Sequence, residues 1–320
     1  MKLITLINSI NDNKYNAGKI SESSYSRHKD TIKIISSSPI SKLDIENITQ
    51  EQLRTFLNSL IYNYSDSVIS KVYMHLRKAF KLALKRGYID KDIMADTEEL
   101  PKPSSKKPRK KVEALTLDEH RKLINVLCNE EASHDYKSII LLMLYTGMRI
   151  GEVLALNYKT DIDFNYNELK ITKTLTKVLG DKYILGNKTK TYMSDRIFPI
   201  TPVVSRILRD AIFRNKGNSQ NMLFWDYKND TFISPPEVNS YLKRIAKKYK
   251  ICPKIHNHML RHTYATRCIE SGVPAVVLQK KLGHKDVSIT LNTYTSVFSK
   301  FEDKKDDDLM RYLTENSLMV

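Results

Sequence analysis

A segment rich in proline and lysine, PKPSSKKPRKK at residues 101–111, divides the chain into two parts. Its three prolines prevent a regular helix, and its six basic residues disfavour burial in a core. The chain has 320 residues, which is long enough for two domains of typical size. We therefore expect a domain over residues 1–100, a basic linker over 101–112, and a second domain with a C-terminal tail over 113–320.

Residues 1–100 carry the signals of α-helices. Thr49 and Gln52 form a capping-box pattern, and an amphipathic apolar run follows them. Ser65 is placed to begin a longer helix, which we expect to end at Gly87. The polar side of this longer helix is either a solvated charged surface or a surface that faces phosphates. Its basic residues are Lys71, Arg77, Lys78, Lys81, Lys85 and Arg86.

The second part combines helices with a short region of strands. Thr116 and Glu119 form another capping box, and Ser234 and Glu237 form a third. Between residues 161 and 200 the apolar pattern alternates, which predicts a small antiparallel sheet. Helices are expected over residues 136–146, 201–214, 235–249 and 258–271. The expected fold class is mainly α with a small antiparallel β-sheet (α+β).

The charge of the chain indicates a polyanionic partner. It carries 53 Lys and Arg against 36 Asp and Glu, a net charge of +17, which suits nucleic acid or an anionic membrane. A membrane is disfavoured, because the longest apolar run of the second part, residues 139–145, is far shorter than the roughly 20 residues of a spanning helix. The N-terminus turns polar too early for a signal peptide.

The cysteines point to a reducing compartment. Cys128, Cys252 and Cys268 are odd in number and scattered, so they form neither a disulfide framework nor a zinc-binding spacing. The expected location is the cytoplasm.

Motifs for nucleotides and metals are absent from the sequence, so we expect no cofactor and no metal. What the second part offers is an ordered set of basic and hydroxyl side chains. In chain order the set is Arg149, Lys188 and Lys190, His258 and Arg261, His284, and Tyr294.

This set suits attack on a phosphodiester. Such a reaction needs a nucleophile, fixed cations for the non-bridging oxygens, and an acid for the leaving oxygen. Arginine is a good phosphate clamp because its planar fork binds two oxygens and stays protonated. A tyrosine hydroxyl, with a usual pKa of about 10, needs nearby cations to act as the nucleophile. A phosphotyrosine would store the bond energy, so rejoining would need neither ATP nor a metal.

Each member of the set is weak on its own. Tyr294 is one of 18 tyrosines, most of which pack in cores, and the lysines are two of 53 basic residues, which are usually solvated. Arg149 follows a common Thr-Gly turn, the pair His258 and Arg261 also suits an ordinary helix surface, and His284 also suits a helix end. The argument rests on their joint order.

From about Ala114 to Phe298 the chain resembles the catalytic domain of the tyrosine recombinase, or phage integrase, family. The shared motifs are TGMRIGE, a KT…S.R…PI hairpin, H.LRHT, LGH and a tyrosine ten residues beyond that histidine. The segment with ISESSY, ITQEQLRTFL and LRKAFKLALKRGYI resembles, less specifically, the family's helical core-binding domain.

The resemblance implies a site-specific DNA recombinase and a role for each residue. Arg149 and Arg261 would clamp the scissile phosphate, and Tyr294 would attack it to give a 3′-phosphotyrosine and a free 5′-hydroxyl. His258 would hydrogen-bond the phosphate and assist proton transfer from the tyrosine. His284 would support the opposite oxygen.

A lysine of the hairpin would protonate the leaving 5′ oxygen. Counted back from Arg196 and Pro199, Lys190 fits the usual family spacing, whereas Lys188 fits only a hairpin that is two residues longer. Glu152 and His262 match family positions that hold the site together without reacting.

The family also implies how such a protein assembles. Its members act as tetramers on two double-stranded DNA sites and exchange strands through a Holliday junction, in some cases with accessory proteins. About 20 residues precede ISESSY, which is too short for an arm-binding domain, so a Xer-like or compact mobile-element recombinase is expected.

Two further segments differ from, or add to, the family pattern. After the core-binding helices the chain reads IDKDIM, where the family often has Asn-Pro. The tail beyond Phe298 is either a solubilising end or, through DLMRYL, a segment that docks on a neighbouring subunit.

Two alternatives remain at this stage. A type IB topoisomerase shares the chemistry, but the chain length and the two-domain layout disfavour it. A DNA-binding regulator without catalysis is disfavoured because every reacting residue is present.

Overall fold

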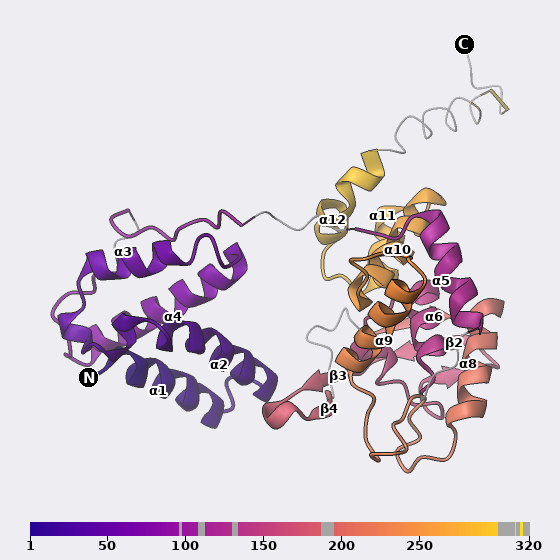
Figure 1. Ribbon diagram of the computed structural model, residues 1–320, viewed down its shortest axis with the longest axis horizontal. Coiled ribbons are helices and arrows are strands. Elements are labelled where there is room, and N and C mark those ends of the chain that lie inside the picture. The colour runs from indigo at the N-terminus through magenta and orange to yellow at the C-terminus, as the bar shows by residue number, and fades with distance from the viewer. Residues whose placement is uncertain are drawn as a thin grey trace. The chain divides into compact units, whose positions relative to one another are not determined.

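The structure of the chain is a computed structural model, shown in Figure 1. It describes residues 1–95, 98–107, 113–129, 134–186 and 195–299, together with residues 311, 314 and 315. The chain forms two compact units, which are described separately here. The first comprises Met1–Lys111 and Lys177–Lys182, and the second comprises Val112–Thr176 and Tyr183–Val320.

The first unit is built from helices around one apolar core. Helices α1, α2 and α4 pack against one another. The helices are α1 (Leu3–Asn16), α2 (Glu22–Ser36), α3 (Gln50–Ser59) and α4 (Asp66–Lys85), with 3₁₀ helices η1 (Pro39–Lys42) and η2 (Ile45–Asn47) between α2 and α3.

Local signals set the ends of these helices. The Thr49 hydroxyl accepts a hydrogen bond from the backbone of Gln52, and the Gln52 side chain accepts one from the backbone of Thr49, so the predicted capping box is confirmed. Ser65 stands at the predicted N-cap of α4 but its side chain makes no capping hydrogen bond. Gly87 follows α4 with a φ of 69°, a left-handed conformation that glycine adopts without strain.

Helix α4 has one apolar side and one basic side. Its buried residues, from Ile69 to Ala83, recur at the helical spacing and enter the core. The six predicted basic residues of its polar side are all exposed.

The second unit contains eight helices among its described residues. The predicted helices over 136–146, 201–214, 235–249 and 258–271 are confirmed to within one residue at each end. The helices are α5 (Leu117–Asn129), α6 (Tyr136–Thr146), α7 (Ile150–Val153), α8 (Pro202–Asn215), α9 (Pro235–Lys248), α10 (Asn257–Glu270), α11 (Ala275–Leu282) and α12 (Val287–Ser299).

The strands form two small sheets, where the alternating pattern predicted one. β1 (Ile162–Asp163), β2 (Glu168–Ile171) and β5 (Arg196–Pro199) pair antiparallel in the order β1-β2-β5. β3 (Thr174–Lys177) and β4 (Tyr183–Gly186) form a separate pair joined by the 3₁₀ turn η3 (Leu179–Asp181). The start of β3 instead lies against α7, where the Cβ position of Gly151 is 2.9 Å from the carbonyl oxygen of Leu175. The fold class predicted from the sequence, mainly α with a little antiparallel β, is confirmed.

Helix α6 is the centre of the second core. Its run from Ile139 to Leu144 is buried, and the helix packs against α8 and α10. An apolar run of this length suits a helix that is surrounded by others. None of the helices that the structure describes has the length and apolar character needed to cross a membrane.

Candidate active site

The loop between α6 and α7 begins with a glycine that no other residue can replace without strain. Gly147 ends α6 with a φ of 66°, and a Cβ atom there would collide with Cδ1 of Tyr264. This left-handed end brings the chain to Arg149, the N-cap residue of α7. The position of Arg149 thus follows from the turn that precedes it.

Glu152 holds two arginines in place. Arg149 donates to it from its side chain at 2.7 Å and from its backbone at 2.9 Å, and Arg196 of β5 donates from Nη2 at 2.8 Å. The Glu152 side chain is only 2% exposed. Burial on its own would raise the pKa of this carboxyl, but Arg196 and Arg149 outweigh that effect and lower the pKa to about 2. Glu152 is therefore a fixed anion at neutral pH.

Arg261 lies at the centre of the site. This residue of α10 is 1% exposed and donates to the carbonyl oxygens of Gly147 at 2.8 Å and Leu282 at 2.6 Å. Its Nη2 also donates to Nε2 of His284 at 3.0 Å. Burial, followed by repulsion from Arg149, lowers the pKa of Arg261 to about 9, so the guanidinium is still charged at neutral pH.

His284 is held in one tautomer. It follows Gly283, whose φ of 64° ends α11. Since its Nε2 accepts from Arg261, its Nδ1 carries the proton and donates to the hydroxyl of Thr290 at 2.8 Å. Burial and then the charge of Arg261 lower the pKa of His284 to about 4, so the ring is neutral at pH 7.

Tyr294 lies in α12, where the helix is locally distorted, with φ −116° and ψ 17° at this residue. Its side chain is 2% exposed, and its hydroxyl shares a 2.8 Å hydrogen bond with Nδ1 of His262. The ring of His258 packs edge-on against His262, with centroids 4.4 Å apart. Burial raises the pKa of Tyr294 to about 12, although Arg261 acts in the opposite direction. Burial also lowers the pKa of His262 to about 4, with His258 adding to the effect.

The site holds three arginines close together. Arg149 and Arg196 both bond to Glu152, Arg261 is held by backbone carbonyls, and the charges of Arg149 and Arg196 add to burial in lowering the pKa of Arg261. A half-buried site with excess positive charge attracts an anion, and guanidinium groups bind phosphate oxygens in pairs. The arrangement is therefore suited to a phosphodiester. Among the described residues there is also no group of three His, Cys, Asp or Glu side chains able to hold a metal ion.

The sequence profile of the phage integrase family matches residues 113–300, which is more than half of the chain. The chain belongs to this family. The integrase of Staphylococcus phage L54a is 27% identical over 299 residues, covering 86% of this chain and 82% of that protein. A tyrosine recombinase of Thermosipho africanus is 30% identical over 275 residues, covering 84% of this chain and 86% of that protein.

Solved structures of the integrase family share the fold. The Tn1549 transposon integrase in complex with a circular intermediate DNA superimposes with a TM-score of 0.75 at 20% identity, covering 92% of this chain and 95% of that one. A lambda integrase tetramer bound to a Holliday junction gives a TM-score of 0.62 at 19% identity, covering 90% and 79%.

The structure brings together most of the residues that the integrase motifs predicted. Arg261 bonds to His284 and to the carbonyl of Gly147, two residues before Arg149. Tyr294 bonds to His262, the residue after Arg261, and His258 packs against His262. The predicted lysine, Lys190, and its alternative Lys188 lie outside the described residues.

Two residues of the site were not assigned a role from the sequence. Arg196 served only to count the hairpin spacing, yet its side chain pairs with Glu152; its place in the S.R…PI motif was the available signal. Thr290 orients His284, and no motif marks it.

Proposed function

We propose that this chain cuts and rejoins DNA strands through a 3′-phosphotyrosine formed on Tyr294. One observation supports the proposal: Arg261 bonds to His284, and its charge acts on Tyr294 and is itself affected by Arg149, so these four side chains lie in one site. Arg261 links three parts of it, through Gly147, Leu282 and His284.

In the cleavage step, the phenolic oxygen of Tyr294 attacks the phosphorus atom and the bond from phosphorus to the 5′ oxygen breaks. The phenolic proton leaves through His262, whose Nδ1 already bonds to that oxygen, while His258 beside it assists and hydrogen-bonds the phosphate. The 5′ oxygen takes a proton from Lys190, with Lys188 as the alternative donor. Rejoining reverses these steps and restores the phosphodiester.

The arginines would lower the barrier by opposing the charge that develops on the phosphate. Their positions are fixed before DNA binds, because Arg149 is held by Glu152 and Arg261 by two backbone carbonyls. A neutral phenol with a pKa of about 12 is a poor nucleophile, so loss of its proton has to be coupled to attack. His284 would support the opposite phosphate oxygen through Arg261, whose Nη2 it binds, because its Nδ1 proton is already donated to Thr290.

The assembly and the domain roles follow from the same proposal. The partner is double-stranded DNA, and the active form is a homo-tetramer on two sites, the arrangement in which lambda integrase was solved on a Holliday junction. The helical first unit would be the core-binding domain, residues 101–112 the linker, and residues 113–320 the catalytic domain. An accessory DNA-bending or directionality protein would set the outcome, and the reaction would take place in the cytoplasm.

Covalent trapping on nicked suicide duplexes tests the proposal. The wild-type protein and Tyr294→Phe are incubated with duplexes that cover candidate sites flanking the gene, without divalent metal, and separated on a denaturing gel. A protein–DNA band at the 3′ end for the wild type alone is expected. If both proteins bind the duplex and neither forms the band, the chain is a DNA-binding regulator without this chemistry.

A further inference from the structure

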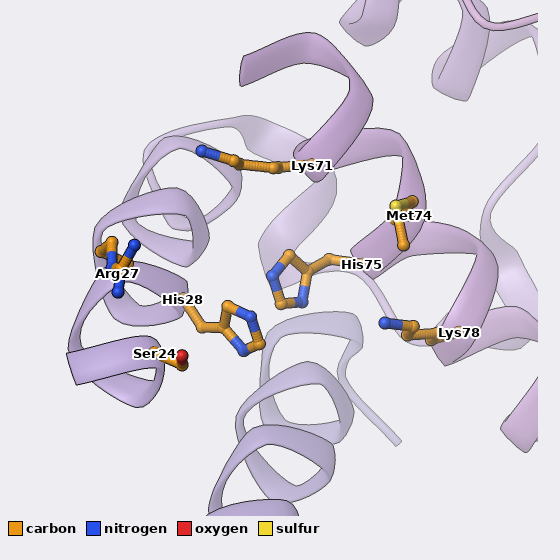
Figure 2. A pocket seen from close by; sticks show the side chains of 7 residues that line it. All are labelled: Ser24, Arg27, His28, Lys71, Met74, His75 and Lys78. Atoms are coloured by element: carbon orange, nitrogen blue, oxygen red, sulfur yellow. The ribbon is translucent and has the colours of Figure 1, made fainter. Parts of the chain in front are cut away.

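A small basic pocket lies in the first unit, between α2 and α4 (Figure 2). Its cavity is about 160 Å³. Figure 2 shows the rings of His28 and His75 near each other, surrounded by basic side chains. The polar residues that line it are Ser24, Arg27 and His28 of α2 and Lys71, His75 and Lys78 of α4.

The positive charges of this pocket have no counterion among the residues that the structure describes. Within the described part of the chain, no carboxylate forms an ion pair with Arg27, Lys71 or Lys78. Lys14 of α1 contacts Lys78, and burial together with the charge of Lys78 lowers the pKa of Lys14. Like charges held this close repel each other, so the empty pocket is electrostatically unfavourable and an anion would relieve it.

The two histidines are uncharged at pH 7, because both pKa values are lowered below the usual 6.5. Their rings meet edge-on, with centroids 5.1 Å apart, and Nδ1 of His28 donates to the side-chain oxygen of Asn11 at 2.9 Å. Burial, then His28, Lys78 and Lys14, lowers the pKa of His75 to about 4. Burial and the charges of Lys78, Lys14, Arg27 and Lys71 also lower the pKa of His28.

We propose that this pocket binds a phosphate of the DNA backbone and that its histidines take up a proton when it does so. The inference rests on the proposed function and adds a DNA contact to the first unit. Arg27 is already oriented, because its Nε and Nη2 donate to the backbone oxygen and the hydroxyl of Ser23. Its remaining Nη1, the Ser24 hydroxyl and the two lysines are donors that suit phosphate oxygens.

The basic residues of α4 extend beyond the pocket, which suits a nucleic acid backbone better than a single free anion. Lys71, Lys78 and Lys85 are spaced seven residues apart, which places them along one side of α4, and all three are exposed. The pocket therefore lies at one end of a basic stripe, as expected for contact with several phosphates of a nucleic acid backbone.

Salt dependence of duplex binding is the first test. Fluorescence anisotropy gives the slope of log K against log salt for the full chain and for Lys71→Gln and Lys78→Gln. Each variant is expected to make the slope less steep by about 0.9, the value for one lost phosphate contact. Lys33→Gln is the matched control: Lys33 is exposed on the other side of α2, where it pairs only with Asp30 among the described residues, and should leave the slope unchanged.

The same variants separate binding from folding. Because Lys78 repels Lys14, Lys78→Gln is expected to raise the thermal unfolding midpoint while it weakens duplex binding. A lysine with a structural role would give the opposite shift in the midpoint. A lowered midpoint with an unchanged salt slope would overturn the proposal.

Proton uptake is the second test. An anion raises the pKa of both histidines, so the affinity for duplex should rise as the pH falls from 7.5 towards 5, by up to about tenfold per pH unit for each proton taken up. Calorimetry in two buffers of different ionisation enthalpy counts these protons. The groups that face the two rings are Lys14 of α1, Arg27 of α2, and Lys71 and Lys78 of α4.

Wild-type binding is compared with His28→Gln/His75→Gln, so that protons taken up by the histidines of the second unit cancel. The difference is expected to be between zero and two protons, and clearly above zero. If the double variant does not fold, proton uptake is measured in Lys78→Gln instead. Loss of Lys78 raises the pKa of both histidines in the free protein, so they already hold more protons before DNA is added. Fewer protons should then be taken up when DNA binds.

The source of the phosphate is resolved with two probes, a random-sequence duplex and inorganic phosphate. A pocket-dependent affinity for the duplex supports the proposal, whereas pocket-dependent binding of inorganic phosphate with an unchanged duplex affinity overturns it. Covalent trapping through Tyr294 is scored separately. A chain that forms the adduct but shows no pocket dependence loses this proposal and keeps the proposed function.

Discussion

The Nδ1 atom of His262 lies 2.8 Å from the hydroxyl oxygen of Tyr294, and this hydrogen bond joins α10 to α12. The tyrosine side chain is 2% exposed, so His262 takes the place of water at the hydroxyl. Both groups are neutral at pH 7, because burial lowers the pKa of His262 and raises that of Tyr294. The bond therefore orients the phenol without ionising it.

A double-mutant cycle measures this bond. His262→Leu leaves the buried hydroxyl of Tyr294 without its partner and is expected to cost about 1–3 kcal/mol of unfolding free energy. Adding Tyr294→Phe removes that hydroxyl, so the double variant should be more stable than the sum of the two single losses predicts, by about 1 kcal/mol. Chemical denaturation of the four proteins gives the coupling. Strict additivity would show that the bond does not stabilise the folded chain.

Glu152 links stability to pH. The pKa of Glu152 is about 2 in the folded chain against a usual value of 4.5. The ionised carboxylate therefore contributes fully to the unfolding free energy above pH 4.5, and this contribution is lost as the pH falls towards 2. The full contribution is about 3 kcal/mol. Glu152→Gln is expected to lose about 3 kcal/mol at pH 7, because two arginines keep their charge without the carboxylate. Denaturation at pH 7, 4.5 and 3 should show the gap between the two proteins closing with acid; a constant gap contradicts the prediction.

Local features of the fold were predictable from the sequence. The capping boxes at Thr49 and Ser234 depend on residues three apart, and both form as predicted. Helix α6 is marked by an apolar run that stops at a glycine. The resemblance to the integrase family picked out Arg149 and Arg261 from 53 basic residues, and their role in the reaction stays a prediction.

Contacts between distant parts of the chain were not predictable in the same way. The pairing of Glu152 with Arg196 joins residues 44 apart, and its geometry depends on where β5 lies. The strands form two sheets and β3 lies against α7 at Gly151, and alternation alone does not encode that arrangement. The resemblance implied that His258 assists proton transfer from the tyrosine, and it did not indicate that the hydrogen bond to the phenol comes from His262, one helical turn further along.

Gly147 is expected to tolerate no side chain. In Gly147→Ala the left-handed backbone is expected to cost about 1 kcal/mol of unfolding free energy, and the collision with Tyr264 about 1–3 kcal/mol more. Gly18→Ala is the matched control, since its φ of 65° is the same but nothing lies within 4 Å of the new Cβ. Thermal unfolding should show the larger loss at Gly147. Cleavage should also slow for that variant alone, because the Gly147 carbonyl holds Arg261; equal losses in stability would argue against the collision.

Arg261 is expected to need its guanidinium fork as well as its charge. Lysine keeps the charge but carries its donors on one nitrogen, so it cannot span the carbonyls of Gly147 and Leu282, and Arg261→Lys should reduce the cleavage rate by about 100-fold. Arg267 lies on the same helix, donates to the carbonyl of Leu115 and pairs with Glu270. Arg267→Lys should lose stability and keep the cleavage rate on nicked duplex. A similar loss of cleavage in both variants would assign Arg261 a structural role only.

Thr290 is expected to act on the reaction through His284. Its hydroxyl accepts the Nδ1 proton of His284 and so fixes Nε2 towards Arg261. Thr290→Val keeps the shape of this fully buried side chain but removes the acceptor, and one lost hydrogen bond of about 1.4 kcal/mol corresponds to a tenfold slower cleavage. Thr290→Ser restores the acceptor and should restore the rate, a recovery that packing alone does not give. Thr293→Val is the control on α12, because the Thr293 hydroxyl donates to the backbone of Ile289 and does not contact His284.

The measurement for Thr290 is the single-turnover rate of adduct formation at saturating duplex, with thermal unfolding followed in parallel. A wild-type rate in folded Thr290→Val would mean that Arg261 alone is sufficient to orient His284.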